Sequence, residues 1–100
     1  MRIFRFITTI ISSILMTSCI INPNKISIAY PNWAEGIAVT HLAREILVEQ
    51  GFQVELLNAD IAPIFTSLAR GKTDVFLDSW LPVTHKPYFE KYQGKFEILG

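Results

Sequence analysis

The sequence predicts a small α/β domain built around a parallel sheet. Two segments show the apolar–polar alternation of strands, residues 25–30 and 52–57, and residues 74–78 are predicted as a third strand. Two segments between them have helical spacing, residues 34–50 and 61–70. Strands that alternate with helices along a chain favour a parallel sheet joined by right-handed crossovers. A length of 100 residues allows one such domain.

The first 18 residues have the pattern of a secretory signal peptide. Arg2 and Arg5 precede an apolar run at residues 7–16, which is too short and too rich in Ser and Thr for a typical membrane-spanning helix. Small residues before Cys19 resemble a bacterial lipoprotein signal, so we expect cleavage before Cys19 and acylation of its thiol. The alternatives are a membrane anchor that is never cut, or a cysteine that is removed with the signal or is a spare buried thiol.

The rest of the chain is a short tether, residues 19–24, followed by a lobe at residues 25–100. The chain has a single cysteine, so no internal disulfide can form. Nine Lys and Arg residues balance nine Asp and Glu residues, and Arg2 and Arg5 would leave with the signal. The mature chain is therefore slightly acidic and has no basic run, which argues against a nucleic-acid partner.

The first strand, Lys25–Tyr30, ends at Pro31–Trp33. A helix over Ala34–Gln50 follows, and Gly51 is the residue expected in the left-handed conformation at its end. One predicted face of this helix carries its apolar residues, and we expect the charged residues to lie off it. The apolar residues are Val39, Leu42, Ala43, Ile46 and Leu47.

The second strand, Phe52–Leu57, leads to Asn58–Asp60, whose side chains can cap a second helix. Pro63 suits the first turn of that helix, which we expect to end at Arg70. The third strand is Asp74–Asp78. A loop at residues 79–85, a short aromatic helix at about residues 87–93 and the start of a fourth strand at residues 95–99 complete the predicted elements.

The predicted strand order, two–one–three, places two tryptophans side by side. Trp33 follows strand one and Trp80 follows strand three. In such sheets ligands bind beyond the carboxyl ends of the strands, at the point where the winding direction switches. Two aromatic faces directed at one volume can hold a cation that donates no hydrogen bonds, such as trimethylammonium. The alternative is that both rings pack the sheet edge against a helix.

His85 lies at the far end of the loop that begins with Trp80 and could donate a hydrogen bond to a ligand carboxylate. Taken alone, such a loop histidine is more often a polar surface residue. Three other patterns do not support a functional site. Gly71–Thr73 lacks the preceding glycine of a phosphate loop, His41 and Glu45 lack a third metal ligand, and Asp74 and Asp78 are better explained by turn and loop hydrogen bonds.

Four segments of the chain resemble the glycine betaine substrate-binding proteins of ABC transporters. The resemblance covers residues 25–100, and its most specific part is the Trp-Leu-Pro-x-Thr-His stretch. The segments are Ala29–Trp33 with Glu35, Leu47–Val54, Leu68–Asp74, and Ser79–His85 with Tyr88.

The resemblance implies a lobe of the type II periplasmic-binding fold, in which two α/β lobes close on the ligand at a hinge. By position, Trp33 and Trp80 match two tryptophans that surround the quaternary ammonium, and His85 matches the histidine that binds the carboxylate. Family members are more than twice as long. The second lobe, a further cage tryptophan and backbone donors for the carboxylate are expected to be missing here.

We therefore expect a binding protein outside the cytoplasmic membrane, held there by its N-terminal lipid or signal anchor and delivering ligand to an ABC permease. The candidate ligands are glycine betaine, proline betaine, carnitine and choline, and His85 favours a carboxylated one. The sequence offers no pair of nucleophile and base, and we expect no enzymatic activity, cofactor or metal. The alternative function is that of a truncated or split lobe that binds a partner protein and has little ligand affinity of its own.

Overall fold

A computed structural model describes residues 22–100. The predicted signal peptide, the lipidation site at Cys19 and the first half of the tether lie outside the described residues, so these predictions are untested. No helix among residues 22–100 has both the length and the apolar character needed to cross a membrane.

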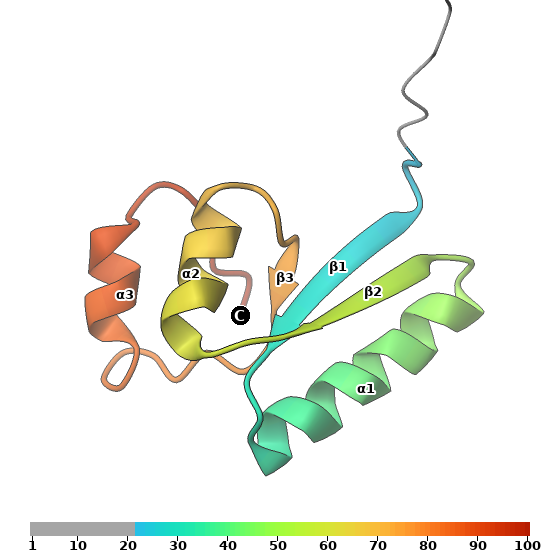
Figure 1. The fold of residues 1–100 in the computed structure, drawn as a ribbon, viewed down its shortest axis with the longest axis horizontal. Coiled ribbons are helices and arrows are strands. Elements are labelled where there is room, and N and C mark those ends of the chain that lie inside the picture. Colours follow the sequence, from blue (N-terminus) through green and yellow to red (C-terminus); the bar gives the residue numbers. More distant parts are fainter. Residues whose placement is uncertain (1–21) are drawn as a thin grey trace, which may run out of the picture.

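Strands and helices alternate along the described chain (Figure 1). The local patterns explain most of their bounds: Trp33 precedes the first helix in an extended conformation, and Gly51 and Gly71 follow the first two helices with positive φ. The elements are β1 (Lys25–Tyr30), α1 (Ala34–Glu49), β2 (Gln53–Asn58), α2 (Ile61–Ala69), β3 (Val75–Phe76) and α3 (Lys86–Lys91).

The three strands form a parallel sheet in the order β2–β1–β3, as predicted. β1 pairs with β2 along its whole length, from Lys25 opposite Gln53 to Tyr30 opposite Asn58. Its pairing with β3 is short, with Ile28 opposite Val75 and Ala29 opposite Phe76. The carboxyl end of β1 therefore lies between the ends of its two neighbours.

Helices cover both faces of the sheet (Figure 1). α1 packs on β1 and β2, whereas α2 packs on β1 and β3 and carries α3 on its flank. The most deeply buried apolar side chains, Ile28, Ala29, Ile64 and Phe65, come from β1 and α2. The core of the described chain is thus concentrated between the sheet and α2.

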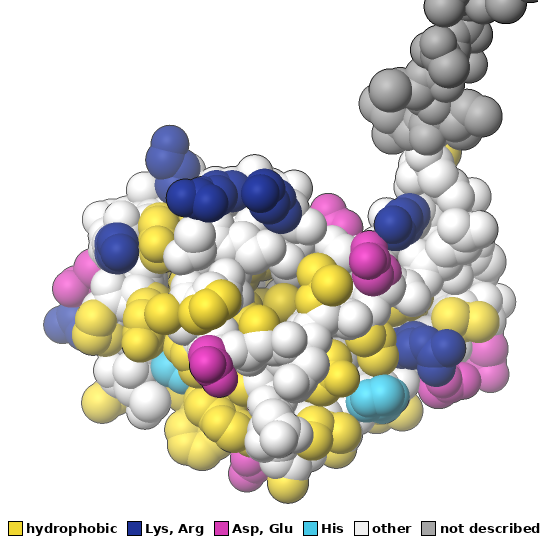
Figure 2. Space-filling model, viewed as in Figure 1, with side chains coloured by type: hydrophobic (Ala, Val, Ile, Leu, Met, Phe, Trp, Pro, Cys, Tyr) yellow, Lys and Arg dark blue, Asp and Glu magenta, His cyan; other side chains and the backbone are white. Residues whose placement is uncertain are grey.

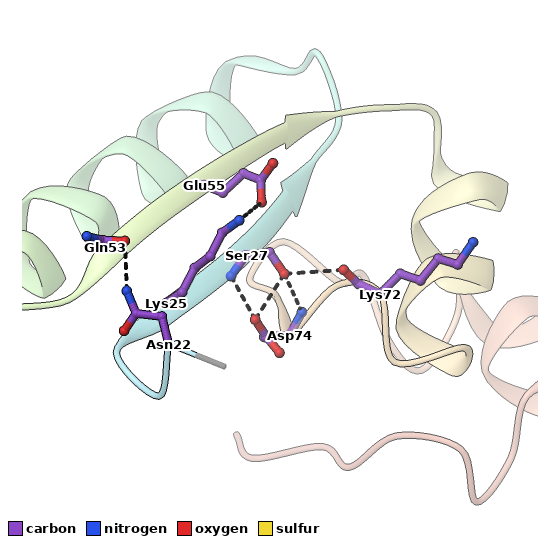
Figure 3. Close-up of polar contacts among 7 residues, drawn as sticks. All are labelled: Asn22, Lys25, Ser27, Gln53, Glu55, Lys72 and Asp74. Carbon is purple, nitrogen blue, oxygen red and sulfur yellow. Dashed lines mark hydrogen bonds and ion pairs between the residues drawn. The ribbon is translucent and has the colours of Figure 1, made fainter. Parts of the chain in front are cut away.

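A network of hydrogen bonds joins the amino end of β1 to the segment before β3 (Figure 3). The backbone N–H of Ser27 donates to Asp74 Oδ2 at 2.8 Å, and the Ser27 hydroxyl lies 3.0 Å from the same oxygen. The backbone N–H of Asp74 in turn donates to the Ser27 carbonyl at 3.0 Å. Asp74 therefore has the turn role that the sequence predicted and aligns β3 with β1.

The face of α1 that packs on the sheet differs from the predicted one. The helix buries Gly36 and Thr40, whereas Leu42 and Ile46 are 62% and 52% exposed. The small Gly36 lets the helix approach the chain after β1 closely: a Cβ placed there would lie 3.1 Å from the Pro31 ring. Ala43 and Leu47 of the predicted face are partly buried, so the inward face of α1 overlaps the predicted one but is rotated toward Gly36 and Thr40.

The predicted fourth strand at residues 95–99 is wrong, and the third is shorter than the predicted Asp74–Asp78. A β-strand exists only when its backbone groups pair with a neighbour. β3 has two residues, and no segment of the described chain pairs with its outer edge. Residues 95–99 run instead as irregular chain, with Phe96 packed against Phe65 and Phe89.

Candidate ligand-binding site

The two tryptophans meet at the carboxyl edge of the sheet, as the predicted strand order requires. Trp33 precedes α1 directly after the end of β1, and Trp80 lies in the loop after β3. Their ring centroids are 5.8 Å apart, and the ring planes are inclined at 69°. The two rings therefore form a corner. A cation resting in it can come within about 6 Å of both rings, which is the range of a cation–π interaction.

Trp80 and His85 are joined through two hydrogen bonds that close their loop. The backbone N–H of Trp80 donates to His85 Nδ1 at 2.9 Å. The backbone N–H of His85 donates to the Trp80 carbonyl at 3.0 Å. The imidazole also stacks on Trp33, with centroids 5.8 Å apart and planes inclined at 28°. The structure thus brings Trp33, Trp80 and His85 together.

The hydrogen bond to Nδ1 determines which nitrogen of His85 carries the proton. A neutral imidazole has one donor nitrogen and one acceptor nitrogen. Because Nδ1 accepts from Trp80, the proton of the neutral ring lies on Nε2. Burial lowers the pKa of His85 below its usual value, and the negative charge of Asp78 opposes part of that effect. His85 is therefore neutral at pH 7, with Nε2–H as its donor.

Aromatic side chains hold His85 in place. Its side chain is only 2% exposed. Phe65 contacts it edge-on at 5.8 Å between centroids, and Phe76 and Tyr88 lie at 6.1 and 6.4 Å. Phe65 also stacks on Tyr88 at 5.3 Å. The sequence suggested core packing for Tyr88, but it provided no signal that Phe65, on α2, supports the site.

Asp78 is a second residue at this site that the sequence analysis did not assign to it. Its Oδ1 accepts a 2.8 Å hydrogen bond from the indole Nε1–H of Trp80. The sequence analysis predicted a loop hydrogen bond for Asp78 but not its partner. The only local signal is the separation of two residues between Asp78 and Trp80 in the same loop.

The two tryptophans differ in exposure. Trp33 is half-buried against His85, whereas Trp80 is 47% exposed. Trp33 thus combines both sequence interpretations, because it packs at the sheet edge and also presents a ring to the corner. Two cavities of about 500 and 370 Å³ lie elsewhere on the surface, and neither is lined by Trp33, Trp80 or His85. At the corner, the Trp80 ring is open to solvent over much of its surface.

Most basic side chains gather on one edge of the molecule. Lys and Arg gather mainly along the edge of the molecule at which α2 ends, where Arg70 and Lys72 are exposed (Figure 2). This is the amino end of the sheet, opposite the tryptophans. A cation approaching the corner therefore meets little repulsion from these residues.

A parallel α/β lobe with aromatic and hydrogen-bonding side chains at its carboxyl edge has the architecture of a ligand-binding lobe. The family model described as the substrate-binding domain of the ABC-type glycine betaine transport system matches residues 24–100. The chain belongs to this family, and it has the parallel α/β architecture of the family's solved members.

The relatives include proteins of known ligand. The glycine betaine/carnitine transport binding protein GbuC of Listeria monocytogenes is 32% identical over 80 residues, which are 80% of this chain and 27% of that protein. Lactococcal OpuAC, solved in its closed conformation with glycine betaine, is 30% identical with a TM-score of 0.70, over 72% of this chain and 28% of that one. The glycine/betaine/L-proline-binding protein ProX of Borrelia burgdorferi is 29% identical with a TM-score of 0.66, over 68% and 26%.

These matches cover about a quarter of each relative. The chain spans 27% of the length of the Listeria protein and 28% of the lactococcal one. The relatives are transport binding proteins, not enzymes.

Proposed function

We propose that this lobe provides one wall of a binding site for glycine betaine or a similar quaternary ammonium osmolyte. The corner formed by Trp33 and Trp80, with the imidazole of His85 stacked on Trp33, is the observation that carries the proposal. A trimethylammonium group donates no hydrogen bonds, so aromatic faces, which attract a cation without accepting a hydrogen bond, suit its recognition. Each good face contributes about 2 kcal/mol once water is excluded.

The carboxylate of the ligand would accept a hydrogen bond from His85. A neutral donor suits this role because it binds a carboxylate without placing a positive charge beside the quaternary ammonium. This favours glycine betaine, proline betaine or carnitine over choline, which has no carboxylate. The matches to binding proteins for glycine betaine and carnitine support the same ligand class.

The rest of the site would come from a second lobe. The open corner and the coverage of about a quarter of each relative agree with this. Closure of a second lobe over Trp80 would exclude water and strengthen both cation–π contacts. The complex would then deliver the ligand to an ABC permease. We further propose export through the signal at residues 1–18 and anchoring outside the cytoplasmic membrane through acylated Cys19.

A second candidate function is that of a lobe that binds a partner protein and has little ligand affinity of its own. The exposed apolar side chains around the corner favour it, because Leu77, Trp80 and Val83 are 41%, 47% and 79% exposed. A partner would cover these side chains as a second lobe would. Truncation of Trp80 separates the two functions, since ligand binding depends on the face of that ring and partner binding is spread over the patch.

A tryptophan-fluorescence titration of the chain from Ile20 onward tests the proposal. The protein has two tryptophans, and both lie at the site, so the signal reports on the corner alone. We expect a saturable change with glycine betaine, a weaker one with choline and none with glycine, which has the carboxylate but not the quaternary ammonium. A folded chain that shows no response to millimolar glycine betaine would contradict the proposal and favour the interaction lobe.

A further inference from the structure

Asp78 lies directly behind the tryptophan corner. Its Oδ1 accepts the Trp80 indole N–H at 2.8 Å. Burial lowers the pKa of His85, and the charge of Asp78 is close enough to offset part of that lowering. The other oxygen, Oδ2, is buried and has no hydrogen-bond partner among the described residues. A buried, unpartnered carboxylate oxygen is costly, so its retention here requires a physical explanation.

The first turn of α1 lies against this carboxylate. A Cβ built on Gly36 would lie 3.1 Å from Asp78 Oδ2, so the oxygen rests directly on the backbone of the first turn of this 16-residue helix. The amino-terminal end of a helix carries a partial positive charge that favours an anion. A side chain larger than hydrogen at position 36 would displace the carboxylate.

Two consequences follow for Trp80. The charge-assisted hydrogen bond holds the indole in one orientation even though the ring is 47% exposed. It also places a negative charge at the indole nitrogen, which enriches the π face in electrons and adds a direct attraction for a cation resting on that face.

Building on the proposed function, we propose that Asp78 is a positioning and selectivity residue of the corner. It fixes the Trp80 ring and makes the site prefer a quaternary ammonium over a neutral group of the same shape. Gly36 contributes to the same positioning, because its lack of a side chain leaves the space that Asp78 occupies.

The test compares two probes on the whole chain, kept in a maltoside detergent because choline-type detergents themselves carry a quaternary ammonium. The probes are glycine betaine and tert-butylacetic acid, in which carbon replaces the quaternary nitrogen. Both present a carboxylate to His85. Affinities are measured by calorimetry for the wild type, Asp78→Asn, Asp78→Ala, Gly36→Ala and the control Glu49→Gln. The control removes one negative charge at the far end of α1, about 20 Å from Gly36.

Asp78→Asn keeps an acceptor for the indole and removes the charge. We expect it to weaken glycine betaine about tenfold and to change the affinity for tert-butylacetic acid by less than about twofold. Asp78→Ala and Gly36→Ala also release the ring, so they should weaken both probes, whereas Glu49→Gln should leave both unchanged. Equal weakening of both probes by Asp78→Asn, or no weakening of either, would overturn the proposal.

The indole N–H resonances of the ligand-free protein give a readout that does not depend on ligand. The hydrogen bond to Asp78 predicts a downfield Trp80 signal that moves upfield in Asp78→Ala and Gly36→Ala, while the Trp33 signal stays in place. A Trp80 signal that does not move would overturn the positioning role. A wild type that binds neither probe would overturn the proposed function and the selectivity with it, and the indole signals would still decide whether Asp78 holds Trp80.

Discussion

Trp33 and Trp80 form one corner, but they differ in how much each contributes to the packing of the lobe. Trp33 stacks on a histidine that is almost fully buried, so its ring also supports the packing of the lobe. Trp80 is half-exposed and is held by its own loop through Asp78 and His85. Truncation of Trp80 should therefore separate binding from stability more cleanly than truncation of Trp33.

For Trp80→Ala we expect about a two- to fivefold loss of affinity for glycine betaine, because a cation–π contact at an exposed site contributes about 0.5–1 kcal/mol. The free energy of unfolding should fall by less than about 1 kcal/mol, as is typical of exposed positions. Calorimetry measures the affinity and urea denaturation the stability. The matched control is Val83→Ala in the same loop, at a side chain 79% exposed. Equal effects of the two variants on binding would contradict this prediction.

The titration of His85 should make the stability depend on pH. Burial lowers the pKa of His85 in the folded chain, so the unfolded chain binds a proton at higher pH than the folded chain does. The free energy of unfolding should therefore fall as the pH drops below about 6.5, the usual histidine pKa, and this loss should level off once the folded chain also binds the proton. Protonation of Nδ1 would also break the hydrogen bond from Trp80.

Urea denaturation between about pH 7.5 and 5.5, around the usual histidine pKa, measures this dependence. His85→Gln should reduce the slope, whereas His41→Gln, at an exposed position on α1, should leave it as in the wild type. The same slope in wild type and His85→Gln would assign the pH dependence to other groups.

Among the elements, β3 depends most on contacts outside its own ladder. It has two residues, and its pairing with β1 covers only those two. At its amino side Asp74 binds Ser27 of β1, and at its carboxyl side Phe76 packs against Phe65 and His85. These ties hold β3 beside β1 and so keep Trp80 beside Trp33.

Asp74→Ala should lower the free energy of unfolding by about 1–3 kcal/mol, because it removes the carboxylate that accepts from the part-buried Ser27 backbone N–H. Urea denaturation measures the loss. Asp60→Ala is the matched control, since Asp60 is exposed and its side chain makes no capping hydrogen bond to α2. If Asp74→Ala cost no more than Asp60→Ala, the network in Figure 3 would not stabilise the β1–β3 pair.

At the scale of the whole molecule, the core and the candidate site share residues. Phe65 is 1% exposed and contacts Phe76, His85, Tyr88 and Phe96. It therefore belongs both to the packing of α2 on the sheet and to the support of the binding edge. A domain of this size buries proportionally little surface, so its free energy of unfolding is small.

Phe65→Ala should cost about 3–5 kcal/mol, the usual effect of truncating a buried phenylalanine. That is a large part of the stability of a small domain, so the cooperative unfolding transition and the fluorescence response to glycine betaine should disappear together. Circular dichroism measures the loss of the unfolding transition, and fluorescence measures the loss of the response to glycine betaine. Leu42→Ala, at a side chain 62% exposed on α1, should change neither. A folded Phe65→Ala chain with normal binding would show that the site does not depend on this core.

By itself the sequence determined the alternation of strands and helices, the parallel sheet in the order β2–β1–β3, and the meeting of Trp33 and Trp80. These features follow from local periodicity and from chain topology, which apply before any side chain is packed. The motif around Trp80 and His85 pointed to the family for the same reason, because it lies within one short loop. The bounds of β2 and α2 agree with their local signals to within one residue, but Asp60 makes no side-chain hydrogen bond at the start of α2, so the predicted cap is wrong there.

Only the tertiary structure decided which face of α1 packs inward, the length of β3, the absence of a strand at residues 95–99, and the contact of Asp78 with Gly36. It also decided the proton position on His85, through the Trp80 backbone N–H. Each of these depends on a close approach between segments distant in sequence or on the presence of a pairing partner. A hydrophobic pattern indicates how much of an element is buried. It does not indicate which atoms of other segments that element contacts.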